Sequence, residues 1–574
     1  MDYPRASAFT APSAPAASTA ARRRMTPGRF AQWLRGLWFS APLARDVLIL
    51  ILGWLVLSAM ENVRYPAIEP RFWYFTPSVD ATVLFVMLAA CGVWRWRVPR
   101  LALGVVAFLF VFVRLFRITD GVTLLMQHRG TNVFIDAQLF PGLVQLAYTT
   151  VPPEKLVMIT TAGVLVLLVI GWIAYRILSV SARLLRDPRR VLAFGACVLG
   201  FAVFGSRTGS AQTRDWHSGA FASSVVPRLG NDFTSYWDAR SFPEQVQRQV
   251  AAQAHLQVGG QLFSELRGAD VLLIFVESYG ETCLSFDQYV EPIRRAHEKW
   301  ESTLTPLGFQ MASHVLESPT MGGYSWLAHI TLATGIKVTD QVRFKRLHDM
   351  HPKTIVHYFK EAGYQSLLVQ PATMKNPGEL IYPFTAHRYS WEFGYRGRNF
   401  SWAPMPDQFV MDWIRRNEIE KTDAPLFVEY NLVSGHMPWN HQAPIVEDWE
   451  KIGDGALYRA MKGINFNTDW SNLRHAHQAY LTAMLYDLEV LRQYIEKFVK
   501  DDTLLIILGD HQPVGEVTGF TESRGAPIHI VSKNPRFIEK FVARGYKRGM
   551  RAENRAPYPG METFMPHFIE DFSR

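Results

Sequence analysis

The sequence predicts a multi-pass α-helical membrane domain of five spans, followed by an α/β domain with a mostly parallel central sheet. Two observations support this prediction. Before residue 207, apolar residues gather in long runs that contain almost no charge. Beyond that point, short apolar runs alternate with longer amphipathic stretches, which is the pattern of strands alternating with helices. At 574 residues, the chain is also too long for one ordinary domain.

Five hydrophobic runs make up the predicted transmembrane domain, 45–206. They lie at about 46–62, 80–96, 101–118, 155–176 and 190–206. A helix needs about 20 residues to cross the ~30 Å hydrocarbon core of a bilayer. The fourth run is long enough alone, and the first and last need flanking residues. The preceding stretch, 1–44, is rich in Ala, Ser, Thr and Pro and is predicted to be a disordered cytoplasmic tail.

Arginines beside these runs predict the orientation of the chain. Three clusters flank alternate ends of the runs: Arg29, Arg35 and Arg45; Arg95, Arg97 and Arg100; Arg183, Arg186, Arg189 and Arg190. Cytoplasmic placement of all three satisfies the positive-inside rule. An odd number of spans then places the second domain on the periplasmic or extracellular side, with a bacterial inner (cytoplasmic) membrane as the natural setting. The net charge of +9 suits this anionic surface better than nucleic acid.

The remainder divides into a juxtamembrane linker, 207–265, with one helix near 243–257, and an α/β domain, 266–574. Candidate strands in the domain are Val271–Val276, Leu367–Gln370, Leu426–Tyr430, Leu504–Leu508 and Ile528–Val531. Candidate helices lie at about 284–305, 325–334, 351–362, 406–417 and 476–500. The chain has three cysteines, too few for a disulfide framework, so we expect this domain to fold on its own core.

Polar residues follow three of the predicted strands. Glu277 and Ser278 come directly after VLLIFV. Asp510 and His511 come directly after TLLIILG, and His436 follows LFVEYNLVSG. Ligand sites of such sheets lie beyond the carboxyl ends of the strands. Glu, Asp and His together suit a divalent cation such as Zn²⁺ or Mn²⁺, although any one of them alone is also typical of a surface acid or a core histidine.

A candidate nucleophile lies in the segment 321–335. Gly322 and Gly323 precede a helix-compatible run in which Ser325 occupies the first turn. The N–H groups and positive dipole end of a helix stabilise an alkoxide and an attached phosphoryl group there. A neighbouring metal ion would lower the pKa of the hydroxyl further. Taken alone, Ser325 is more typical of a helix N-cap than of a nucleophile.

Together these motifs resemble the alkaline phosphatase/sulfatase superfamily. Its sulfatase members carry a nucleophile ten positions before the Gly of an LLTG-type end, as Ser325 precedes Gly335. VES at 276–278 and GDH at 509–511 resemble its metal motifs. SGHMPW at 434–439 resembles the histidine motif of lipoteichoic acid synthase-like phosphoglycerol transferases. The membrane anchor with an outer domain is also similar to these synthases and to lipid A phosphoethanolamine transferases.

The resemblance implies an alkaline-phosphatase/sulfatase-like fold and one divalent metal ion, Mn²⁺ or Zn²⁺. The metal ligands it implies are Glu277, Ser325, Asp510 and His511. Ser325 would attack the phosphodiester of a phospholipid donor, expel diacylglycerol and pass the headgroup to an envelope glycan or glycolipid acceptor. His436 would contact the phosphate or protonate the leaving group. Many relatives use Thr as the nucleophile, so Thr320 stays a rival.

The transferred group stays open between phosphoglycerol and phosphoethanolamine. Sulfatase chemistry is disfavoured, because Ser325 is not followed by the Pro and Arg that formylglycine formation requires. Two alternatives are a membrane-tethered phosphodiesterase or phosphatase and a catalytically inactive scaffold for envelope assembly. A channel or transporter is disfavoured, since the hydrophobic runs hold no paired charges.

Further residues are candidates for supporting roles. Trp391, Arg396 and Arg398 belong to an aromatic and basic stretch that could hold an anionic headgroup. The same stretch also fits a packed loop. Asp487, on the predicted inward face of helix 476–500, is a candidate partner of the metal ligands. His329 is expected to be a buried structural histidine.

Overall fold

The computed structural model describes residues 41–62, 76–141, 144, 148, 153–208, 217–218, 221–222, 225–253, 256, 261–374, 382–468 and 475–573. Most of the predicted tail and part of the predicted linker lie outside these residues. The chain divides into two compact units. The first comprises Met1–Met60, Phe75–Phe110 and Leu168–Ser223, and the second Glu61–Tyr74, Val111–Leu167 and Ser224–Arg574. The predicted domain boundaries at 206 and 265 stay predictions.

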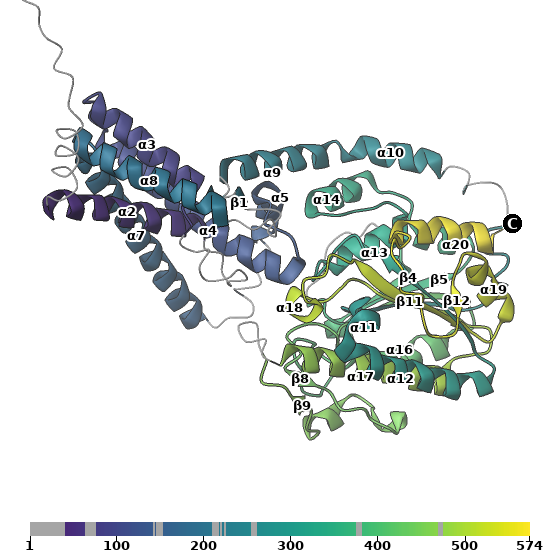
Figure 1. Cartoon of the computed structure of the whole chain (residues 1–574). Coiled ribbons are helices and arrows are strands. Elements are labelled where there is room, and N and C mark those ends of the chain that lie inside the picture. The colour runs from purple at the N-terminus through teal and green to yellow at the C-terminus, as the bar shows by residue number, and fades with distance from the viewer. Residues whose placement is uncertain are drawn as a thin grey trace, which may run out of the picture. The chain divides into compact units, whose positions relative to one another are not determined.

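Apolar helices occupy all five predicted hydrophobic runs (Figure 1). They are α2 (Ala41–Asn62), α3 (Val79–Val93), α4 (Arg100–Gln127), α7 (Pro153–Leu184) and α8 (Pro188–Thr208). Among the described residues, three helices are long and apolar enough to cross a membrane: Pro42–Asn62, Arg100–Gln127 and Pro153–Leu184. The helix α3 is apolar but has only 15 residues. The structure therefore supplies three candidate spans where the sequence predicted five.

The first unit packs through aromatic side chains. The ring of Phe194 in α8 lies 5.9 Å from that of Trp54 in α2 and 5.4 Å from that of Phe85 in α3. The indole N–H of Trp54 donates to Thr82 Oγ1 at 3.0 Å, which satisfies a polar group inside an apolar cluster. Large apolar side chains elsewhere on these helices are exposed, as lipid-facing residues of a membrane helix would be.

Shorter elements follow α4 and α8 in the sequence. The helices α5 (Val133–Asp136) and η2 (Ala137–Leu139) follow α4, and the short strands β1 (His217–Ser218) and β2 (Phe221–Ala222) pair with each other. In the predicted linker, α10 (Phe242–Ala252) corresponds to the expected helix near 243–257. The helix α9 (Val225–Arg240) was not predicted, because its apolar residues are few and scattered.

An eight-stranded sheet forms the centre of the α/β domain, in the order β12-β4-β11-β10-β3-β7-β5-β6. The strands are β3 (Val271–Val276), β4 (Gln310–Glu317), β5 (Gln365–Gln370), β6 (Ala386–Tyr389), β7 (Leu426–Leu432), β10 (Leu504–Gly509), β11 (Gly525–Ser532) and β12 (Lys547–Arg548). The five strands from β10 to β6 are parallel, whereas β11, β4 and β12 pair antiparallel. The predicted mostly parallel sheet is confirmed.

Helices cover both faces of this sheet (Figure 1). One layer holds α12 (Asp287–Leu304), α16 (Asp407–Asn417) and α17 (Ala476–Phe498), and the other holds α13 (Ser325–Thr334), α15 (Ile355–Glu361), α19 (Pro535–Ala543) and α20 (Phe564–Phe572). All six residues of β3 are buried, and alternate ones join the two cores. A strand covered on both faces needs such a continuous apolar run, which is why its bounds could be predicted.

Shorter elements complete the domain. They are α11 (Thr282–Ser285), η4 (Thr305–Leu307), α14 (Gln341–Met350), η5 (Ser390–Glu392), η6 (Ile419–Lys421), β8 (His441–Gln442), η7 (Trp449–Lys451), η8 (Ala456–Arg459), β9 (Ile464–Asn465), α18 (Gly515–Thr518) and η9 (Met561–Thr563). The sequence did not predict the strands β4, β6 and β12 or the helices α14, α19 and α20.

Candidate active site and metal centre

The predicted site residues lie at one edge of the sheet. The strand β3 is parallel to β10 on one side and to β7 on the other, so the carboxyl ends of these three strands coincide. The strand β4 reaches the same edge, because two antiparallel steps through β11 restore the direction of β10. The residues that follow β3, β4, β7 and β10 are thereby brought together, in accordance with the general placement of ligand sites in such sheets.

Three buried side chains form a cluster at this edge. One ligand atom of each of Glu277, Asp510 and His511 lies within 4.8 Å of the others. His511 Nε2 is 3.4 Å from Glu277 Oε1 and 3.6 Å from Asp510 Oδ2. Ser325 Oγ donates a hydrogen bond to Glu277 Oε2 at 3.0 Å and lies 3.2 Å from His511 Nε2. The structure thus brings together the four residues predicted to be metal ligands.

Backbone groups orient the ligand atoms of this cluster. The N–H groups of Ser278 and His511 donate to Asp510 Oδ1 at 2.8 and 2.7 Å, which leaves Oδ2 facing the cluster. His511 Nδ1 lies 2.8 Å from the carbonyl oxygen of Gln512. A carbonyl can only accept, so Nδ1 carries a proton and Nε2 is the nitrogen available to a metal. Ser278 adopts φ of 61°, a conformation that non-glycine residues rarely take.

The three residues of the cluster shift one another's pKa values. Burial, reinforced by the charge of Glu277, raises the pKa of Asp510 to about 7. Burial works against the charged form of His511, but Asp510 and Glu277 outweigh it and raise the pKa to about 9. Burial is likewise outweighed at Glu277, whose pKa is lowered by the hydrogen bond and charge of His511. The group therefore attracts positive charge, and its donor set of two carboxylates and one imidazole fits a divalent cation.

The start of α13 places Ser325 against this cluster. Ser325 is the first residue of the helix, and Tyr324 before it adopts φ of 62°. Gly322 has φ of 64°, and a Cβ on it would lie 1.5 Å from the carbonyl oxygen of Met126, so only glycine fits. The Gly322 N–H donates to the carbonyl of Gln512 at 2.8 Å. This bond joins the turn 320–324 before Ser325, here called the serine loop, to the segment after β10.

The rival hydroxyl, that of Thr320, is used elsewhere. Thr320 Oγ1 donates to the carbonyl of Gly323 at 2.8 Å and closes the turn before the helix. Within the described part of the chain, Ser325 is the hydroxyl that contacts both Glu277 and His511. Ser325, rather than Thr320, is therefore the hydroxyl in contact with the cluster.

His436 lies on the loop after β7, where its charge contributes to lowering the pKa of Glu277. Its ring stacks on Trp402 with centroids 3.9 Å apart. Gly435 runs so close to the strand end that a Cβ would lie 2.2 Å from the carbonyl oxygen of Glu277. The carboxylate of Asp407, at the start of α16, accepts from the N–H groups of Val433 and Ser434 at 3.0 and 2.7 Å and so holds this loop.

Asp487 is fully buried on α17. Burial and the neighbouring charge of Asp407 raise the pKa of Asp487 well above its usual range, and Glu277 adds to the effect. Asp487 therefore lies near Asp407, the acid that holds the loop of His436, and within electrostatic range of Glu277. This position is compatible with its predicted supporting role.

The predicted headgroup-binding residues make their described contacts away from the cluster. Arg396 pairs with Asp454 at 3.5 Å and is largely exposed, and the guanidinium of Arg398 lies 5.1 Å from the Phe400 ring centroid. Trp391 packs against Tyr389, with centroids 5.0 Å apart. Their role in substrate binding stays a prediction. From the same stretch, Trp402 is the residue that reaches the site, through its stacking on His436.

Other residues of the site were not predicted. The carbonyl of Gln512, the N–H of Ser278 and the carboxylate of Asp407 act through backbone contacts that carry no sequence signature. Ser278 and Gln512 could have been suspected only from their places beside Glu277 and His511. The predicted structural histidine, His329, packs on Phe275 with ring centroids 4.1 Å apart, and burial lowers its pKa to about 3.

The domain is thus a three-layer α/β sandwich that carries a Glu, Asp and His cluster beside a serine at the start of a helix. Residues 332–554 match the family model described as Sulfatase. The match includes His436, Asp510 and His511 and begins after Ser325. The resemblance to the alkaline phosphatase/sulfatase superfamily is confirmed. No curated protein matches the chain.

Several solved structures match the chain at low sequence identity. The lipoteichoic acid synthase LtaP from Listeria monocytogenes is 11% identical with a TM-score of 0.32, over 46% of this chain and 65% of that one. This chain therefore spans less than two thirds of its length. The phosphoethanolamine transferase EptA from Neisseria meningitidis is 12% identical with a TM-score of 0.42, over 92% and 94%. The Streptococcus pyogenes phosphoglycerol transferase GacH is 12% identical with a TM-score of 0.34, over 58% and 92%.

Proposed function

We propose that the chain is a membrane-bound, metal-dependent transferase that moves a phospholipid headgroup, phosphoglycerol or phosphoethanolamine, to an envelope glycan or lipid acceptor through a phosphoserine on Ser325. The observation that carries the proposal is the position of Ser325 Oγ, 3.0 Å from Glu277 and 3.2 Å from His511, at the first turn of α13. A hydroxyl in contact with a buried acid and imidazole cluster is positioned for nucleophilic catalysis.

Glu277, Asp510 and His511, with Ser325, would hold one divalent ion, Mn²⁺ or Zn²⁺. When bound there, the ion supplies positive charge that stabilises the serine alkoxide and polarises the phosphoryl oxygens. With the ion bound, the Ser325 hydroxyl, which donates to Glu277 Oε2, would release its proton to solvent, so that the alkoxide attacks in the first step and is regenerated in the second.

In this proposal, the headgroup is transferred in two steps. In the first, Ser325 Oγ forms a bond to phosphorus while the bond from phosphorus to diacylglycerol breaks, and protonated His436 gives its proton to the leaving oxygen. In the second, the acceptor hydroxyl attacks the phosphoserine, its proton passes to His436, and the Ser325 alkoxide leaves. The stacking of His436 on Trp402 supports this role, because it fixes the imidazole plane.

A lipid donor is supported by the three apolar helices that would hold the domain at a bilayer. The arginine clusters favour five spans, with the catalytic domain on the periplasmic side of a bacterial inner membrane. Without Pro and Arg after Ser325, formylglycine chemistry is not supported.

Intact-mass analysis of the purified full chain tests this function. The chain is incubated with phosphatidylglycerol or phosphatidylethanolamine and with Mn²⁺ or Zn²⁺, and the adduct is then located by peptide mapping. We expect a mass increase on Ser325 whose size identifies the headgroup. Headgroup release to water, with no transfer to added glycan, would instead establish the phosphodiesterase alternative. Bound metal without adduct or lipid turnover would favour the inactive scaffold.

A further inference from the structure

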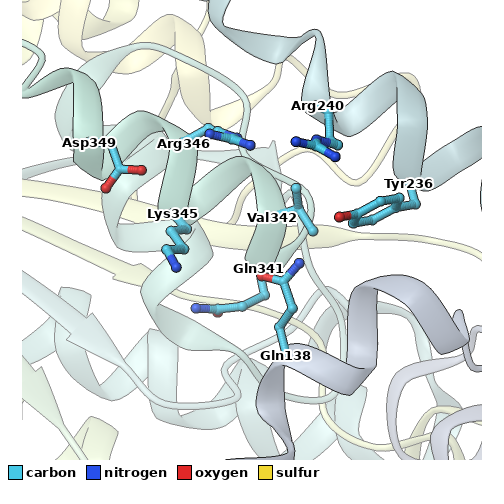
Figure 2. A pocket seen from close by; sticks show the side chains of 8 residues that line it. All are labelled: Gln138, Tyr236, Arg240, Gln341, Val342, Lys345, Arg346 and Asp349. Atoms are coloured by element: carbon cyan, nitrogen blue, oxygen red, sulfur yellow. The ribbon is translucent and has the colours of Figure 1, made fainter.

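A pocket apart from the Glu277 cluster lies between η2, α9 and α14 (Figure 2). Its volume is about 580 Å³, which is sufficient for a substantial polar group. Its floor is Val342, which packs with Ile135 and Ala239 in a small buried cluster. The pocket therefore has a buried apolar base, and polar side chains from three elements surround its opening.

Cations dominate the rim of this pocket. Arg240 comes from α9, and Lys345 and Arg346 come from α14, with the ends of the two arginines pointing toward one another (Figure 2). Among the described residues that line the pocket, Asp349 is the single acid. Among the described residues, no acid lies within ion-pair distance of the three cations. By contrast, Arg343 on the same helix is paired with Asp340, so the uncompensated charge of α14 gathers in the pocket.

Neutral donors complete the rim. The side chains of Tyr236, Gln138 and Gln341 also line the pocket. Guanidinium, ammonium, hydroxyl and amide groups around one cavity suit the oxygens of a phosphate, and arginine forks bind such oxygens in pairs. The chemistry of the pocket is therefore that of a phosphate site.

A row of exposed aromatic side chains, here called the aromatic ridge, lies next to the pocket. Phe134 of α5 contacts Phe233 of α9 at a centroid distance of 5.4 Å, and Phe233 contacts Trp237 at 6.1 Å. The exposed fractions of these three side chains are 36, 49 and 60%. Arg240 lies over the Trp237 ring at 5.8 Å, so the ridge and the pocket are continuous. Exposed aromatic rings of this kind occur at membrane–water interfaces.

The helix α9 is tied to a candidate span. Arg228 Nη2 pairs with the buried Asp120 Oδ1 of α4 at 3.1 Å, and it also donates to the carbonyl of Thr131. The same arginine pairs with Asp232 one turn along α9 at 3.2 Å. The ridge is thus held beside the end of a helix that is long and apolar enough to enter a bilayer.

The pocket is also connected to the nucleophile segment. Gln341 Oε1 accepts from the indole N–H of Trp326 at 3.1 Å, and Trp326 directly follows Ser325. Tyr324, which directly precedes Ser325, packs edge-on against Trp326 with centroids 5.0 Å apart. One lining residue of the pocket, Gln341, therefore contacts the residue that follows Ser325.

We propose that this pocket binds the phosphate of a second, phosphate-bearing lipid, on the acceptor side of the reaction, with its hydrocarbon along the ridge of Phe134, Phe233 and Trp237. The proposal rests on the proposed function, in which the donor phosphate must reach Ser325 and so cannot occupy this pocket. Charge and apolar surface together select an amphiphile over a soluble glycan. The acceptor is accordingly an anionic lipid or a lipid-linked glycan.

Binding is tested with the purified full chain carrying Ser325→Ala, in neutral detergent with a chelator, so that neither turnover nor metal contributes. The probes are dihexanoyl phosphatidic acid, dihexanoylglycerol and inorganic phosphate, titrated by native mass spectrometry. We expect the phosphatidic acid to bind at least about tenfold more tightly than either half, because both charge and apolar contacts contribute. The double variant Lys345→Glu, Arg346→Glu should weaken its binding about tenfold.

Lys360→Glu is the matched control, since Lys360 is exposed on α15 and forms no ion pair among the described residues. It should leave binding within about twofold. If the double variant unfolds, Arg240→Gln alone tests the opposite wall of the pocket. Unchanged binding in the pocket variants overturns the proposal, and so does inorganic phosphate that binds as tightly as the lipid. Failure of the proposed function would be visible separately, as the absence of a Ser325 adduct in the wild-type chain.

Discussion

Glu277 and Glu429 lie on neighbouring strands of the same sheet, and both side chains are buried, at 8 and 4% exposure. Glu277 comes directly after β3, whereas Glu429 lies within β7, beside Leu273. The charge and hydrogen bond of His511 overcome burial and lower the pKa of Glu277. Burial alone acts on Glu429 and raises its pKa to about 8.

The difference shows that burial does not make a carboxylate functional. What distinguishes the sheet edge is the convergence of His511, His436 and Ser325 on one acid, which keeps that acid ionised and able to bind a cation. Among the described residues, no charged or hydrogen-bonding group offsets the burial of Glu429, so its neutral form is favoured. The two glutamates therefore provide a test and its internal control.

The largest effect is expected at the hydroxyl that contacts Glu277. Ser325→Ala should lower the rate of headgroup transfer by about 10³-fold or more, since no covalent intermediate can form. Turnover of phospholipid in detergent measures this. Thr320→Ala is the control, because that hydroxyl is bonded to the Gly323 carbonyl, and it should retain most activity. The reverse order of the two variants would transfer the nucleophile role to Thr320.

The next largest effect is expected on metal content, which should fall in a variant of the cluster and stay unchanged in a variant of Glu429. Asp510→Asn removes one of the two carboxylates of the cluster and should weaken metal binding about 100-fold or more, because a neutral amide is a poor partner for a divalent ion. Elemental analysis after dialysis gives the metal content. Glu429→Gln should keep the wild-type content. Equal metal in both variants would remove Asp510 from the ligand set.

A smaller effect is expected from the acid that holds the His436 loop. Asp407→Asn replaces an acceptor of the Val433 and Ser434 N–H groups and should lower kcat about tenfold, with the metal content unchanged. Asp412→Asn is the control on the same helix, because Asp412 pairs with Arg415 and Arg416 away from the loop. It should reduce thermal stability with little change in kcat. Loss of metal from the Asp407 variant would mean that Asp407 supports the cluster itself.

The smallest expected effect is a pH dependence of the free energy of unfolding that is caused by Glu429. The folded-state pKa of about 8 is above the unfolded value, so the stabilisation from Glu429 is complete below the unfolded pKa and is lost as pH rises toward 8. Glu429→Gln removes this dependence. Relative to the variant, the wild-type chain should lose about 1 kcal/mol of stability per pH unit across that window. Thermal unfolding of both chains from pH 5 to 9 measures it, and parallel curves would contradict a raised pKa.

The sequence predicted the elements whose residues are uniform in character. The bounds of β3 were predicted because every residue is apolar, and those of α13 because the Gly pair and Gly335 mark its limits. The strand β4 was missed because its interior contains Ser313 and His314, although it is the strand that leads toward Ser325. The helix α14 was missed because its buried apolar residues are only Val342 and Leu347 among many charges.

The candidate site was predicted to the same extent. Glu277, Asp510 and His511 were found because they follow apolar strands, and Ser325 because it begins a helix-compatible run after a Gly pair. Their roles as ligands were implied by the family resemblance, and the structure brings the four side chains together. The orientation of Asp510 and His511 could not be predicted, since it depends on an N–H of Ser278 and a carbonyl of Gln512. Such contacts use backbone groups that almost every residue has, so the residue type does not reveal them.

The close approach of Gly322 to the Met126 carbonyl affects how the protein can be divided for biochemistry. Met126 belongs to α4, and the neighbouring His128 contacts the carbonyl of Thr521 and the hydroxyl of Thr518 at 2.9 Å. A soluble fragment that starts after the last apolar helix would lack all of these supports for the serine loop. Weak activity of such a fragment would then be explained by the missing contacts, so activity should be measured with the intact chain.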